Sequence, residues 1–163
     1  MGRDWAPNYP NIYMDKFDKE TLLKCPLKPH TYFPYLDDIF RIWPHGKDAF
    51  SEFLNIFNTH EPPIKFESSI CIDSVNYLDT TVFKDPKNNN TLLTKVFFKA
   101  TDIHQMLHKH SFHPKHTFKS LLRLQIIRFV RICSNEKDFD KAWDILFQAL
   151  CKTNYSKRWM CGF

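Results

Sequence analysis

Two adjacent aspartates, Asp37 and Asp38, interrupt an apolar and aromatic stretch that runs from Tyr32 to Phe40. Burying two like charges side by side is costly unless cations neutralise them. The pattern therefore predicts two β-strands joined by a turn at the acidic pair. Such a turn can present both carboxylates to divalent metal ions. A solvent-exposed turn that binds no metal is the simpler interpretation of the same residues.

The rest of the first half of the chain alternates between helical and β-type patterns. A helix is predicted from Ala6 to about Leu23, with Ile12, Tyr13 and Phe17 at roughly helical spacing. A second helix is predicted from Lys47 to His60 and ends before the prolines at 62 and 63. Short β-type runs follow at residues 64–66, 69–72, 77–83 and 92–98.

The second half of the chain is predicted to be helical. Thr117 is a candidate N-cap for a helix that reaches about Ile132, and residues 134–137 turn the chain into another helix. Together the patterns predict an α+β protein with two parts, residues 1–100 and residues 101–163. The first part would combine antiparallel strands with helices on one face, and the second would be a small helical region.

Composition and charge limit the classes of protein that fit. A chain with 43% hydrophobic residues, 16 Phe and only 3 Gly can bury a core, which argues against a disordered protein. No membrane span or signal-peptide pattern is visible, so nucleus or cytoplasm is expected. The five cysteines lack metal-site spacing and are predicted to be free thiols. Between Lys95 and Arg131, eight Lys or Arg residues face a single acid, so this stretch could contact phosphates.

Several segments resemble the reverse transcriptases of Penelope-like retroelements, in the same order along the chain. The central match is Tyr35-Leu36-Asp37-Asp38, which is similar to the Y-x-D-D signature of those enzymes. The other matching segments are Met1-Gly2 with Ala6-Pro7, Asn11 and Met14; Pro63 to Glu67; Tyr77 to Thr80; and a downstream set of Thr101-Asp102-x-His104, Ser111-x-His113-Pro114-x-His116 and Arg131 to Ser134. Five segments in order make coincidence a poor explanation.

The resemblance implies a part of an RNA-directed DNA polymerase, with residues 1–100 as a truncated palm and residues 101–163 as a thumb-like or helix-turn-helix-like region. It implies that Asp37 and Asp38 bind two Mg²⁺ ions and that Lys65 acts near the incoming triphosphate. Partners would be template RNA, a DNA primer and deoxynucleotide triphosphates. Another metal-binding aspartate is expected upstream of Met1, so this chain alone is expected not to polymerise DNA.

Two readings of the C-terminal helices remain open. As a thumb, they would place Lys115, Lys119, Arg123 and Arg128 along a nucleic-acid backbone, with contacts that do not depend on sequence. As an independent helix-turn-helix module, the second helix would enter a major groove. Its charge-mixed side, with Asp140 and Asp144, favours the thumb and weak non-specific binding.

Other functions were weighed against these. Five histidines between His104 and His116 could bind zinc or copper, but no cysteine lies among them, and a metal site is the less favoured interpretation. A domesticated, non-catalytic interaction protein and a decayed copy that does not fold by itself are two further alternatives.

Overall fold

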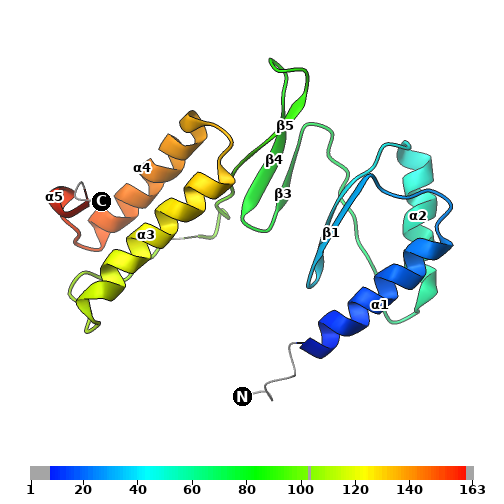
Figure 1. Cartoon of the computed structure of the whole chain (residues 1–163), viewed down its shortest axis with the longest axis horizontal. Coiled ribbons are helices and arrows are strands. Elements are labelled where there is room, and N and C mark those ends of the chain that lie inside the picture. Colours follow the sequence, from blue (N-terminus) through cyan, green and yellow to red (C-terminus); the bar gives the residue numbers. More distant parts are fainter. Residues whose placement is uncertain (1–7, 103, 161–163) are drawn as a thin grey trace. The chain divides into compact units, whose positions relative to one another are not determined.

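The computed structural model describes residues 8–102 and 104–160 and shows the predicted α+β fold, with antiparallel sheets and a helical C-terminal region (Figure 1). The chain divides into two compact units, Met1–Ile70 and Cys71–Phe163, and each is described by itself. The functional division predicted after residue 100 stays a prediction. The matching segment at Met1-Gly2 and Ala6-Pro7 lies outside the described residues, as does Cys161.

The first unit consists of two helices and one β-hairpin. Its elements are α1 (Asn8–Lys24), β1 (Thr31–Tyr35), β2 (Asp38–Ile42) and α2 (Lys47–His60). The strands pair antiparallel from Thr31 with Ile42 to Tyr35 with Asp38. The hairpin at the acidic pair and the helix at residues 47–60 are therefore confirmed. Because an isolated two-stranded hairpin is only marginally stable, the packing of the helices has to support it.

The core of the first unit is aromatic. Phe17 of α1 and Phe57 of α2 are almost fully buried, and partly buried side chains from the hairpin pack against them. The sequence analysis placed Ile12 and Tyr13 on the same helix face as Phe17, but both are exposed. Five residues rotate a helix by about 140° from its starting direction, so Ile12 and Phe17 face different sides.

The second unit joins a three-stranded sheet to a pair of antiparallel helices. Its elements are β3 (Ser74–Tyr77), β4 (Thr80–Asp85), β5 (Thr91–Val96), α3 (Lys115–Ile132), α4 (Glu136–Lys152) and the short α5 (Lys157–Met160). The strand order is β3-β4-β5, with both pairs antiparallel. In Figure 1 the chain leaves β5, crosses an irregular stretch and enters α3, which runs alongside α4.

Strand β5 and the turn between α3 and α4 are connected by hydrogen bonds of Thr94. The Thr94 amide donates to Ser134 Oγ at 2.9 Å, and the Ser134 amide donates to the Thr94 carbonyl at 2.9 Å. The Thr94 hydroxyl donates to the Ile132 carbonyl at 2.5 Å. Both helices also contact β5. The sheet and the helical pair therefore share one core, which contains Val96, Leu122, Phe129, Leu146 and Leu150.

Three β predictions and one cap prediction were wrong. Residues 64–66 and 69–72 form no strand. In the first run, the amide and carbonyl of Phe66 bond to the Asn58 side chain at 2.6 and 3.2 Å and so are not free to pair with a strand. The run 77–83 is broken by a hairpin turn at Leu78 and Asp79. Thr117 lies inside α3, which begins at Lys115 and has no side-chain cap. The next helix does have one, because Asn135 accepts from the Asp138 amide at 2.9 Å.

Candidate functional site

The turn between β1 and β2 places Asp37 and Asp38 at the exposed end of the hairpin. Leu36, which precedes them, has φ 52°, in the left-handed region that a bulky side chain rarely adopts. A non-glycine residue there costs on the order of 1 kcal/mol, and such strain is often found at functional sites. The strained turn therefore exposes Asp37, and Asp38 follows it as the exposed first residue of β2.

A cavity of about 300 Å³ lies beside this turn, between α1 and the hairpin. Its polar lining includes Asn11, Asp15 and Asp18 of α1, and Leu36 lines it from the turn. Asp18 is the buried member, at 6% exposure, and its Oδ1 has no hydrogen-bond partner. A buried carboxylate oxygen without a partner is unfavourable, since neither water nor a donor compensates its lost hydration.

Asp18 belongs to a buried polar group with Tyr32 and Arg41, which face each other across the two strands. Burial raises the pKa of Asp18, and the nearby Tyr32 hydroxyl and Arg41 only partly oppose the rise. Burial likewise raises the pKa of Tyr32 and lowers the pKa of Arg41. The Tyr32 hydroxyl and Arg41 Nη1 have no well-formed hydrogen bond either. Three convergent unsatisfied groups of this kind suit a buried water molecule.

Lys65, the third residue predicted for catalysis, lies in the loop after α2. Its Nζ donates to the Asn58 carbonyl at 2.8 Å, in the last turn of that helix. This is a common way for a lysine to stabilise a helix C-terminus. The interaction accounts for the position of Lys65 without any reference to Asp37 or Asp38.

The residues at the turn do not supply all the ligands of the two Mg²⁺ ions that the resemblance implies. Two-metal chemistry requires several oxygen ligands that hold the ions about 3.5 to 4 Å apart. Within residues 8–102 and 104–160, no group of three or more His, Cys, Asp or Glu side chains is arranged to hold a metal ion. Asp37 and Asp38 are suitable ligands but do not by themselves complete such a centre.

The second unit contains a turn of closely similar sequence and geometry. Tyr77 pairs with Thr80 across a two-residue turn in which Leu78 has φ 53°, as Tyr35 pairs with Asp38 across Leu36. The carboxylate of Asp79 in this second turn is engaged, because Oδ2 lies 2.8 Å from Nη2 of Arg128 on α3. This ion pair was not predicted, because its two residues lie far apart in the sequence.

The Asp79–Arg128 pair lines a cavity of about 380 Å³ within the second unit. Asp102 and His104 lie at the same cavity, with Asp102 Oδ2 3.1 Å from His104 Nδ1. The hydrogen bond from the His104 amide is the main reason that the pKa of Asp102 lies below its ordinary value. The cavity thus contains two paired carboxylates and no excess of positive charge.

Three of the four predicted cations on α3 form one exposed row. Lys115, Lys119 and Arg123 are spaced four residues apart, so successive side chains lie about 6 Å apart along the helix. Arg128 lies nine residues beyond Lys119, which places it about 180° around the helix axis. The structure therefore brings Lys115, Lys119 and Arg123 together and directs Arg128 to Asp79 instead.

The two long helices of this unit carry different charge. Helix α3 contains no aspartate or glutamate. Helix α4 has exposed acids, Asp140 and Asp144 among them, and its N-terminus is acidic and has a side-chain cap, Asn135. A phosphate backbone would therefore be attracted to α3 and partly repelled by α4.

The five histidines between His104 and His116 lie before and at the start of α3, and His104 pairs with Asp102. Among the described residues, no metal-binding group includes them. Four of the cysteines are free thiols, and Cys25 is the buried one. Within residues 8–102 and 104–160, no helix is long and apolar enough to cross a membrane.

Comparison with known proteins identifies one similarity. Residues 105–160 match the model of the animal helix-turn-helix domain, and this range contains α3, α4 and α5. No curated protein and no solved structure matches the chain. The helix-turn-helix character of the C-terminal region therefore agrees with the sequence analysis, and the resemblance to reverse transcriptases stays a prediction.

Proposed function

We propose that the second unit binds nucleic acid through the exposed row of Lys115, Lys119 and Arg123 on α3. The observation that carries this proposal is a row of three exposed cations, spaced four residues apart on a helix without acids, inside a region that matches a helix-turn-helix domain. Lysine and arginine at such spacing contact successive phosphates but carry no information about base sequence. The binding is therefore sequence-independent and dominated by electrostatics.

The charge of α4 argues for this mode over reading of a major groove. In helix-turn-helix proteins the second helix enters the groove and contacts base edges. Here that helix would bring Asp140 and Asp144 towards the duplex. Sequence-specific recognition by α4 would have to overcome this repulsion, whereas α3 meets no such cost.

Salt dependence tests the proposal directly. Three phosphate contacts predict that the logarithm of the duplex binding constant falls with the logarithm of salt concentration with a slope of about −2.7. Fluorescence anisotropy with labelled duplexes of unrelated sequence measures the slope and should show similar affinities for all of them. One sequence bound far more tightly than the others at physiological salt would contradict the proposal.

We propose as a second candidate that the first unit is part of a reverse transcriptase palm, with Asp37 and Asp38 as metal ligands for template-directed DNA synthesis. The strained turn that presents both carboxylates supports this candidate. Lys65 would act near the triphosphate only after release from the Asn58 carbonyl. The incomplete ligand set at the turn leads to the expectation that this chain does not polymerise DNA by itself.

A primer-extension assay measures that expectation. The 163-residue chain, supplied with an RNA template, a DNA primer, deoxynucleotide triphosphates and Mg²⁺ or Mn²⁺, should yield no extended primer. Extension that Asp37→Ala abolishes would contradict the expectation and would make Asp37 a catalytic residue of this chain. The exposed Asp48→Ala on α2 is the matched control for loss of one surface carboxylate.

A further inference from the structure

The loop that precedes α3, residues 107–114, exposes one aromatic ring completely. Phe112 has 106% of its reference exposure, whereas Leu23, the next most exposed large apolar side chain among the described residues, has 78%. A fully exposed phenylalanine gains nothing from burial and contributes no packing to the fold. Its position therefore suits contact with a partner outside the chain.

Hydrogen bonds within the loop give it a defined shape. The Ser111 amide and hydroxyl both donate to the His108 carbonyl, at 2.9 and 2.7 Å, and the His113 amide donates to the Ser111 carbonyl at 2.9 Å. These bonds form one tight turn over residues 108–111 and a second, three-residue turn with Phe112 at its centre. The ring is thus presented by an ordered loop and not by an extended chain.

Long-range contacts anchor the same loop to the segment between α4 and α5. The Lys109 amide donates to the Thr153 carbonyl at 3.0 Å, and the Tyr155 hydroxyl donates to the Leu107 carbonyl at 2.8 Å. Asn154 Nδ2 lies 3.0 Å from His108 Nε2. Because these partners lie on a separate part of the helical unit, the loop is held before any ligand arrives.

The ammonium group of Lys109 adds a further anchor, because it lies among three aromatic rings. Its Nζ is 4.2 Å from the ring centre of Trp159, 5.2 Å from Tyr155 and 5.6 Å from Phe118. Such cation–π contacts are favourable within about 6 Å. Lys109 is therefore used internally to fix the loop, and Phe112 remains on its outside.

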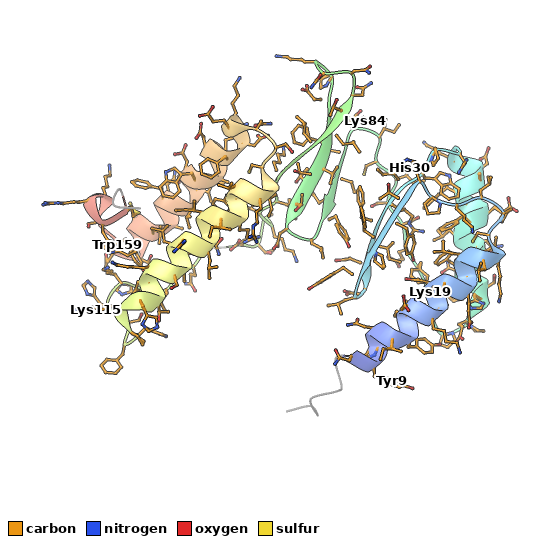
Figure 2. All side chains as sticks on the ribbon, viewed as in Figure 1. Tyr9, Lys19, His30, Lys84, Lys115 and Trp159 are labelled. Carbon is orange, nitrogen blue, oxygen red and sulfur yellow. The ribbon has the colours of Figure 1, made fainter. Side chains whose placement is uncertain are left out.

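The surroundings of Phe112 are positively charged. The chain has no aspartate or glutamate between residues 103 and 135 or between residues 145 and 163. Figure 2 places Lys115 and Trp159 at the same end of the α3–α4 pair, where α5 also lies. Exposed cations in the first turns of α3, the last turn of α4 and α5 are Lys115, Lys119, Lys152, Lys157 and Arg158. An exposed ring among cations and without nearby acids suits a base and its phosphates.

We propose that the 107–114 loop is a binding site for single-stranded nucleic acid, in which Phe112 stacks on an unpaired base while the surrounding cations contact the phosphates. This inference rests on the proposed nucleic-acid function of the second unit and deepens it. Every base presents a flat face, so stacking selects unpaired strands over duplex without selecting a sequence. The α3 row binds any phosphate backbone, and Phe112 adds the preference for unpaired bases.

The test compares the 163-residue chain with Phe112→Ala in binding a labelled oligothymidylate and a blunt duplex of equal length. Loss of one stacked base is expected to weaken single-strand affinity about tenfold and to change duplex affinity less than about twofold. Phe112→Trp should restore single-strand affinity, and Phe112→Leu should not. Tyr9→Ala, which removes an exposed ring of the first unit, is the matched control and should have no effect (Figure 2).

The possible outcomes separate this inference from the proposed function. Unchanged single-strand affinity in Phe112→Ala, with the expected salt slope intact, overturns the role of Phe112 alone. Stacking is also overturned if Phe112→Leu keeps full single-strand affinity, or if Phe112→Ala weakens binding of duplex and of single strand equally. If Phe112→Ala instead dissolves a dimer without changing affinity, the ring is a protein contact. If neither oligonucleotide binds, the proposed function and this inference both fail.

Discussion

Reversal of two charges in the exposed row, by Lys119→Glu with Arg123→Glu, is expected to weaken nucleic-acid binding on the order of a hundredfold at low salt. Two of the three proposed phosphate contacts are lost, and two carboxylates then repel the backbone. The salt slope should become shallower by about two units, since each lost contact releases one fewer counterion. Fluorescence anisotropy over a salt series measures both quantities.

The matched control for this variant lies on the neighbouring helix. Lys137→Glu with Lys141→Glu makes the same change of net charge at the same four-residue spacing, on exposed positions of α4. If α3 is the interface, the α4 variant should lose less than about threefold in affinity, which reflects only the general field of the unit. A larger loss in the α4 variant than in the α3 variant would show that α4 is the binding helix.

Truncation of the fully buried Phe129 is expected to abolish nucleic-acid binding through loss of structure. Phe129 is 1% exposed in α3 and belongs to the core that β5, α3 and α4 share. Phe→Ala substitutions at such positions cost about 3–5 kcal/mol, a large share of the stability of a small domain. Thermal unfolding followed by circular dichroism should show the loss, and the variant should no longer bind an oligonucleotide near its unfolding midpoint.

Phe57→Ala is the counterpart in the first unit. Phe57 is 0% exposed and lies among the aromatic rings of α1, α2 and the hairpin, so its truncation should cost a similar free energy of unfolding. Nucleic-acid binding should persist in this variant, because all residues proposed to bind belong to the second unit. Loss of binding in both variants would show that the interface needs both units.

Local sequence patterns predicted the elements whose stability is decided within a few residues. Phe50, Phe53 and Phe57 recur on one face of a helix, and α2 has the predicted bounds. The acidic pair interrupts two apolar runs, and the hairpin turn lies there. Two predictions from the same kind of pattern were wrong. Ile12 and Tyr13 have roughly helical spacing with Phe17 but are exposed on α1, and the apolar run at residues 77–83 contains a two-residue turn.

For some site residues, the sequence predicted the kind of side chain but not its position in the fold or its partner. A basic helix after residue 114 was evident from composition, and three of its four proposed cations do form one row. The helix period already separates Arg128 from Lys119, but its partner, Asp79, is distant in sequence and could not be inferred from local spacing. The loop before α3 was recognised only for its histidines, and Phe112 was not singled out.

The amino-acid sequence by itself determined the α+β class, the hairpin at Asp37 and Asp38, and the excess of positive charge before and along α3. These features follow from hydrophobic periodicity and composition, which reflect interactions between residues close together in the chain. Only the tertiary structure decided that Arg128 pairs with Asp79 and that the 107–114 loop is anchored to residues 153–159. The physical reason is that those interactions join segments more than forty residues apart, and their free energy exists only once the helices and strands have packed.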